Sequence, residues 1–181
     1  DVRISGIIAI KLAPGDKLIQ ASFVDKGDNV ILTTQKGLSI RFKESDVREM
    51  GRAATGVRGI KLSSGDVVVG ADVSRKGVKE KDLSLLVVSE NGYGKQTSLS
   101  EFKLQKRSGS GIKCASVTTK TGKLMASRVL GSDAEELVVI SKKGQVIRTN
   151  IKEIPSMGRS TQGVRIMKLR AGDSIAAIIC L

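Results

Sequence analysis

Histidine is absent from this chain of 181 residues, and cysteine occurs only twice. Without histidine, a zinc site lacks its usual nitrogen ligand, and the ordinary general base for a serine or cysteine nucleophile is missing. Cys114 and Cys180 lie far apart and form no metal-ligand spacing. We therefore expect no catalytic residue, metal or cofactor, and we interpret both cysteines as structural thiols in a reducing, cytoplasmic compartment.

Aromatic residues make up 2% of the chain, tryptophan is missing, and proline occurs twice. Platforms for stacking unpaired bases are therefore scarce, whereas a duplex held by its phosphates needs none. No apolar run approaches the roughly 18 residues of a membrane-spanning helix, so we expect no membrane partner. The 20 glycines, with so little proline, favour many short strands joined by tight turns.

What the chain has in excess is positive charge, with 31 basic against 18 acidic residues and a net charge of +13. The basic residues are spread along the chain, which indicates a folded basic surface instead of a disordered tail. Such a surface attracts polyanions, with nucleic acid first and an anionic membrane second. The alternative is a ribosomal protein or a merely soluble basic protein.

Three stretches repeat one another: Asp28–Val73, Leu83–Leu130 and Glu135–Leu181. Each has an apolar run, a tight turn, a second run with basic residues, a glycine-bounded loop and a further strand. The turns end in Gly37, Gly92 and Gly144, and the loops end in Gly56, Gly111 and Gly163. Two hairpins per unit predict four strands, which is the size of one propeller blade.

The predicted fold is therefore all-β and propeller-like, built of four-stranded antiparallel blades, with about three and a half blades of a larger disc. Lys43–Glu49 and Asn150–Pro155 are expected to form only short helical turns. The predicted units of this one domain are the end of a preceding blade (1–27), a blade (28–73), a linker (74–82), a blade (83–130) and a last blade (131–181).

The loop Gly51–Gly56 resembles a phosphate loop, and 158–163 repeats it. A P-loop needs Lys followed by Ser or Thr directly after the second glycine, with a helix behind it. Here Val57 and Arg58 follow at the head of a strand, so we reject nucleotide hydrolysis. Such a loop can still place backbone N–H groups and a guanidinium against DNA phosphate, or it can be a plain surface loop. The single tyrosine, Tyr93, is interpreted as packing beside its hairpin turn.

Basic residues recur at matching places in the repeats, which predicts a band of cations that would bind duplex DNA with little sequence preference and bend it. The middle repeat has the largest excess of positive charge, with 8 basic and 2 acidic residues. The predicted DNA-binding residues are Arg41, Arg52, Arg58, Lys95, Lys106, Arg107, Lys113, Arg148, Arg159 and Arg165.

These motifs resemble the C-terminal domain of the A subunit of bacterial DNA gyrase. The resemblance rests on Val47–Arg52, Thr55–Ile60, Asn91–Lys95, Glu153–Ile154 and 158–164, and it covers essentially the whole chain. It implies a six-bladed β-pinwheel in which blades exchange strands and DNA bends around a basic rim. The family's signature box belongs to the first blade, and Gln105–Gly111 in the equivalent loop is only similar to it.

The resemblance also implies the partners: duplex DNA, the remainder of the gyrase A subunit, and, in the holoenzyme, the gyrase B subunit. DNA supercoiling driven by ATP would then belong to the whole enzyme, a type II topoisomerase (an isomerase), while the cleavage tyrosine and the ATPase lie outside this chain. Two alternatives remain open. The chain resembles the related pinwheel in the A subunit of topoisomerase IV, and a propeller-like scaffold that binds protein is the alternative from a different class.

Overall fold

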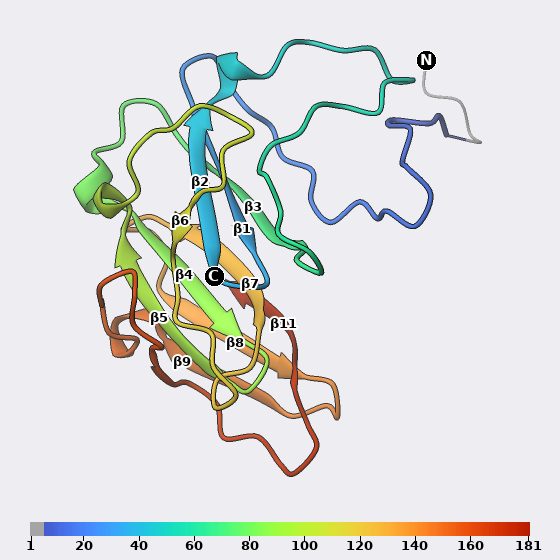
Figure 1. Ribbon diagram of the computed structural model, residues 1–181. Helices are drawn as coiled ribbons and strands as arrows, with labels where there is room; N and C mark the ends of the chain where they lie inside the picture. The colour runs from blue at the N-terminus through green and yellow to red at the C-terminus, as the bar shows by residue number, and fades with distance from the viewer. Residues whose placement is uncertain (1–5) are drawn as a thin grey trace.

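The computed structural model describes residues 6–181 and shows an all-β chain (Figure 1). Its strands form three antiparallel sheets, in the orders β3-β1-β2-β6, β10-β5-β4-β7 and β11-β8-β9. The strands are β1 (Asn29–Thr34), β2 (Leu38–Lys43), β3 (Val68–Ser74), β4 (Ser84–Ser89), β5 (Tyr93–Ser98), β6 (Ile112–Lys113), β7 (Leu124–Leu130), β8 (Glu136–Ser141), β9 (Val146–Asn150), β10 (Val164–Arg165) and β11 (Ile175–Cys180). Short 3₁₀ helices lie at η1 (Glu44–Asp46), η2 (Glu80–Asp82), η3 (Leu99–Glu101) and η4 (Ile151–Glu153).

Each sheet is built on a tight hairpin: β1 with β2, β4 with β5, and β8 with β9. The turns contain Gly37, Gly92 and Gly144, whose φ angles are 86°, 78° and 81°. This left-handed backbone is accessible to glycine without a steric cost, which confirms that the turn glycines are a backbone requirement. The expected short helical turns are also confirmed, because η1 and η4 form within them.

Neighbouring repeats exchange strands. Strand β6, from the second repeat, pairs with β2 of the first, so that Lys113 lies opposite Leu38. Strand β10, from the third repeat, pairs with β5 of the second, and Arg165 lies opposite Tyr93. The first two sheets therefore have the four strands that the repeat predicts, while the third has three within the part of the chain that the structure describes.

The sheets have an inner and an outer edge. Strands β3, β7 and β11, here called the hub strands, lie at one edge of their sheets, and β7 packs beside both of the others. The backbone N–H of Val129 in β7 donates to the carboxylate of Asp72 in β3 at 2.8 Å. The exchanged strands β6 and β10, the rim strands, form the opposite edge of the first two sheets.

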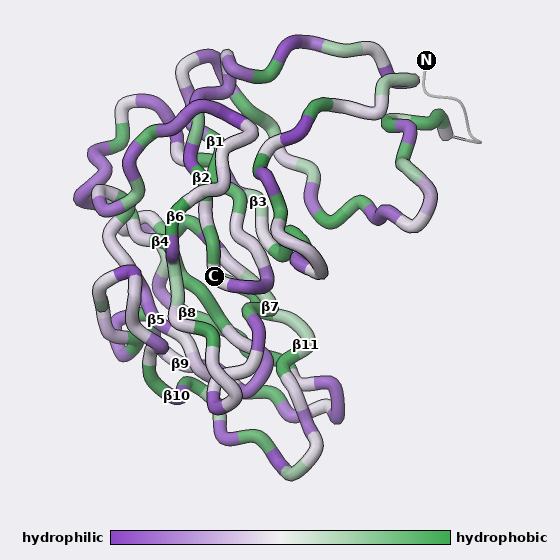
Figure 2. Tube along the Cα trace, viewed as in Figure 1, coloured by the Kyte–Doolittle hydropathy of each residue, from purple (hydrophilic) through white to green (hydrophobic). Residues whose placement is uncertain are grey.

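The core lies between the sheets, and β4 contributes to both sides of it because successive side chains of a strand point to opposite faces. Leu85 and Val87 pack toward the first sheet, and Leu86 and Val88 pack toward the third. Full burial of each such side chain contributes about 1.5–3 kcal/mol. Figure 2 shows hydrophobic residues along the strands and also along the N-terminal segment, which forms no strand.

The N-terminal segment differs from the sequence-based expectation. Residues 1–5 of the expected half blade lie outside the described residues, and residues 6–27 form no strand. Within it, a turn at Pro14-Gly15 is closed by a hydrogen bond from the Asp16 N–H to the Ala13 carbonyl at 3.0 Å. Apolar side chains stay at the surface here, with Phe23 92% exposed. No sheet edge among residues 6–181 pairs with this segment, so its apolar side chains are not drawn into a core.

Candidate nucleic-acid interface

The rim strands place one cation each at the same position of successive sheets. Lys113 and Arg165 both stand two residues after a loop glycine, and both are exposed. Each lies opposite the first residue after a hairpin turn, Leu38 or Tyr93. The exchange of strands therefore displays the repeated basic residue at the outer edge of the molecule.

The loop before the first rim strand fastens the second repeat onto the first sheet. Ser108 donates its N–H to the Gly59 carbonyl at 2.8 Å, and its backbone has a φ of 71°, unusual for a residue other than glycine. The guanidinium of Arg107 donates to the Asp46 carbonyl at 3.1 Å and to the Arg58 carbonyl. Arg107 is therefore committed to the joint between the blades.

The next loop repeats this arrangement. The guanidinium of Arg159 donates to the Lys113 carbonyl at 3.3 Å, and its backbone N–H donates to Glu101 at 3.3 Å. Because Arg159 matches Arg107 in the repeat, and Lys113 matches Arg58, the same bond recurs at both joints. We call Arg107 and Arg159 the latch arginines. Their guanidinium groups bind the chain itself, although each remains partly accessible to solvent.

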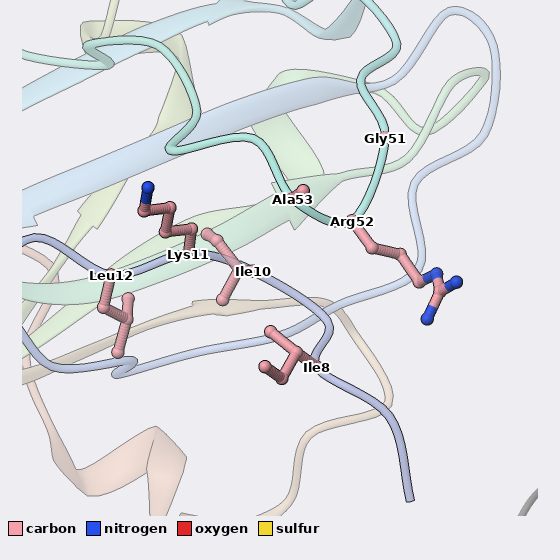
Figure 3. A pocket seen from close by; sticks show the side chains of 7 residues that line it. All are labelled: Ile8, Ile10, Lys11, Leu12, Gly51, Arg52 and Ala53. Atoms are coloured by element: carbon pink, nitrogen blue, oxygen red, sulfur yellow. The ribbon is translucent and has the colours of Figure 1, made fainter.

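The third member of this set, Arg52, is exposed and makes no latch in the described structure. Its loop lies beside the N-terminal segment, where the Lys11 N–H donates to the Ala54 carbonyl at 3.3 Å. Between them lies an open hollow of about 870 Å³, lined mainly by apolar groups such as Ile8 and Ile10. Figure 3 shows the Arg52 guanidinium pointing away from those isoleucines. The described residues that line this hollow include no carboxylate or hydroxyl.

Arg41 lies in the interior and not at the rim. It is 3% exposed, and its guanidinium donates to Glu80 at 2.6 Å and to the Phe102 carbonyl at 3.3 Å. In the next sheet, the side-chain amide of Gln96 makes the corresponding bond, to the Ile154 carbonyl at 2.8 Å. In the first two sheets, this strand position therefore ties the sheet to the 3₁₀ turn of the following repeat.

Lys95 is also an interior residue, at 0% exposure. Its ammonium group donates to the carbonyls of Gly158 and Arg159 at 2.6 and 2.9 Å, which holds the third repeat's loop on the second sheet. Burial lowers the pKa of Lys95 to about 8. Lys95 and Arg41 do not occupy equivalent strand positions: Lys95 lies opposite Val87, three residues after its turn glycine, whereas Arg41 is four residues after Gly37. A shift of one residue turns a side chain to the other face.

The other predicted residues lie at the surface. The side chain of Lys106 is 89% exposed and pairs with Asp46 at 3.0 Å, close to the exposed Arg58 and its latch. Arg148 is exposed on β9 and pairs with Glu136, which raises the pKa of Arg148. Sequence reasoning missed three further basic residues, Lys120, Lys168 and Arg170, which gather around Tyr93. They lie in the connections between β6 and β7 and between β10 and β11.

Within residues 6–181 no three His, Cys, Asp or Glu side chains gather where they could hold a metal ion. In the same range, no helix combines the length and apolar character needed to cross a membrane. Both thiols are free, and burial raises the pKa of Cys114 to about 12. The distinctive chemistry of the described surface is therefore its basic charge.

The chain is similar to known proteins over nearly its whole length. The family model for the DNA gyrase C-terminal domain, a β-propeller, matches residues 3–25, 28–75, 84–130 and 135–181. The A subunit of DNA gyrase from Staphylococcus epidermidis is 39% identical over 174 residues, which cover 96% of this chain and 19% of that protein. The chain thus spans about a fifth of the length of this relative.

Two solved structures share the fold. A DNA gyrase A C-terminal domain superposes with a TM-score of 0.85 at 31% identity, covering 97% of this chain and 58% of that one. The C-terminal domain of DNA topoisomerase IV superposes with a TM-score of 0.89 over 100% of this chain and 55% of that one, but at 21% identity this likeness concerns the fold alone. The sequence and structural matches together confirm the expected family: this chain belongs to the DNA gyrase C-terminal domain family of β-propeller domains.

Proposed function

We propose that this chain binds duplex DNA through its phosphates, without preference for a base sequence, along the edge that carries the rim strands. The observation that carries the proposal is the repeated placement of Lys113 and Arg165 on exchanged strands, exposed at the same edge of two successive sheets. Phosphate contacts by Lys and Arg supply affinity that does not depend on sequence. The chain's net charge of +13 adds a long-range attraction for the polyanion.

The proposed contacts are the predicted residues that reach the surface. Lys106 and Arg58 lie beside the first joint, and Arg52 lies on the loop next to the N-terminal segment. The latch arginines are assigned first to the joints between blades, and Arg41 and Lys95 are left out of the interface because they are buried. DNA that follows successive rim strands on a curved edge has to bend, so the same geometry supports bending.

In the whole protein, we propose that this domain holds bent DNA for a type IIA topoisomerase. The remainder of the gyrase A subunit, together with the gyrase B subunit, would supply strand passage and ATP hydrolysis, and supercoiling would take place in the bacterial cytoplasm. The support for this role is the 39% identity to the A subunit of a DNA gyrase.

The proposal is tested by titrating the chain against a fluorescein-labelled duplex of random sequence at several salt concentrations. If about five phosphates are neutralised, the logarithm of the association constant falls with the logarithm of salt at a slope of about −4 to −5. A single strand of equal length serves as the control ligand, and it should bind more weakly because stacking platforms are scarce. An affinity that ignores salt, or a strong preference for one short sequence, would contradict the proposal.

A further inference from the structure

The only tyrosine in the chain, Tyr93, lies at the start of β5 in a strongly basic setting. It is 7% exposed, and its hydroxyl accepts a hydrogen bond from the Arg165 guanidinium at 2.8 Å. Arg165 and Lys120 also lie 5.3 and 5.4 Å from the centre of its ring. Because these cations occupy the ring's surroundings, the ring is not free to stack on an unpaired base.

Tyr93 lines a cavity of about 280 Å³ between the second and third repeats. The charged residues that line this cavity are Lys120, Arg165, Lys168, Arg170 and Asp173. The carboxylate of Asp173 already accepts two hydrogen bonds from the chain, from the Ser141 hydroxyl at 2.6 Å and from the Lys143 N–H at 3.0 Å. Among residues 6–181, no carboxylate lies within 4.0 Å of any of the four cations.

The polar groups of the cavity match the chemistry of a phosphate. The Tyr93 hydroxyl accepts from Arg165 and still has its own proton to donate, while the guanidinium and ammonium groups donate and carry positive charge. Asn91 holds the backbone of Lys120 in place, because its side-chain amide donates a hydrogen bond to the Lys120 carbonyl at 3.1 Å. Fixed donors and unneutralised cations in one concavity are what an anion site requires.

We propose that this cavity is a phosphate seat that receives one phosphodiester of the bound duplex. This inference rests on the proposed DNA binding and adds a specific anchor to it. Arg165, a rim-strand residue, connects the seat to the proposed DNA path. Of the two strand-exchange junctions among residues 6–181, one has the seat, because Leu38 takes the place of Tyr93 opposite Lys113 in the first sheet.

Two variants of equal charge test the seat by labelled-duplex titration. The double variant Lys120→Gln and Lys168→Gln removes two cations from the cavity, and Lys61→Gln with Lys152→Gln removes two exposed cations elsewhere. At about 0.1 M salt, the cavity variant should lose about tenfold in duplex affinity and the control variant about threefold or less. Equal losses in the two variants would overturn the seat.

Tyr93→Phe removes only the hydroxyl and keeps the ring, so it should lower duplex affinity about threefold to fivefold. Its midpoint of urea unfolding should stay within the range spanned by the cavity and control variants. An unchanged duplex affinity in this variant would remove the hydroxyl from the site and overturn the assignment as stated.

A second measurement separates the sources of phosphate. Because the chain has one tyrosine and no tryptophan, its intrinsic fluorescence reports Tyr93 alone. Pyrophosphate, which does not absorb in this range, should change that fluorescence with saturation in the wild type and not in the cavity variant. If pyrophosphate binds there but the cavity variant retains its duplex affinity, the seat serves free phosphates and the duplex assignment is wrong. If the wild type does not bind duplex at all, the proposed function itself fails.

Discussion

Lys95 offers a quantitative test of the joint between the second and third repeats. Its ammonium group is buried against two carbonyls of the loop 158–163, and burial lowers its pKa from 10.5 to about 8. We consider the substitution Lys95→Met, which keeps a long side chain in the same space and removes the charge. It also leaves the two carbonyls without their donor.

The sign of the pH dependence follows from which state binds more protons. Between pH 8 and 10.5 the unfolded chain keeps the Lys95 proton that the folded chain has released, so the wild type gains stability as the pH rises. From about pH 7 to about pH 9 this linkage amounts to about 1 kcal/mol in the free energy of unfolding. The contribution is lost as the pH falls through the folded pKa, and Lys95→Met should lack it at every pH.

The assay is urea unfolding of the wild type and of the Lys95→Met variant at several pH values between about 7 and about 9. The quantity of interest is the wild-type free energy of unfolding minus that of the variant, because groups such as Cys114, whose pKa is raised to about 12, are present in both proteins. This difference should rise with pH by about 1 kcal/mol. A difference that stays flat or falls would refute the assignment of Lys95 as a buried ammonium.

Two further predictions concern the exchanged strands and the latches. Gly111→Ala and Gly163→Ala should lower the unfolding free energy by about 2 kcal/mol more than Gly56→Ala. All three have positive φ, but a new Cβ would clash with a backbone oxygen of the preceding repeat at the first two, that of Ser39 or Gly94, and would lie in open space at the last. Equal losses in urea unfolding would contradict the exchange. Arg159→Gln should cost about 1 kcal/mol in the same assay, because a hydrogen bond to the neighbouring sheet is lost, whereas the unlatched Arg52→Gln should cost close to nothing. An unaffected Arg159 variant would contradict the latch.

Much of the fold follows from local patterns. The turn glycines predict the hairpins because their backbone conformation is required locally, and the apolar run of β4 is typical of a strand buried on both faces. Strand exchange does not follow from the residues themselves, because the local sequence of Ile112–Lys113 does not indicate which sheet edge this strand joins. The family resemblance implied the exchange, and the pairing of β6 with β2 shows where it occurs.

The candidate site was harder to predict because burial depends on distant partners. Arg41 and Glu80 are 39 residues apart in the chain, so their pairing is invisible to a local pattern. The sequence does distinguish Lys95 from Arg41, because Lys95 stands three residues after its turn glycine, Gly92, and Arg41 stands four residues after Gly37. The cations around Tyr93 come from three separate turns or strands, and only the folded chain brings them together.

The central claim, that the rim strands hold duplex DNA by its phosphates, is tested most directly by removing one charge from the rim and one from the hub. Lys113→Gln takes an exposed cation from β6, and Arg128→Gln takes one from the hub strand β7. The measurement is the dependence of duplex affinity on salt for the wild type and both variants. The rim variant should bind more weakly with a slope about one unit less steep, and the hub variant should keep the wild-type slope. An unchanged slope in Lys113→Gln, or an equal change in Arg128→Gln, would place the DNA elsewhere on the molecule.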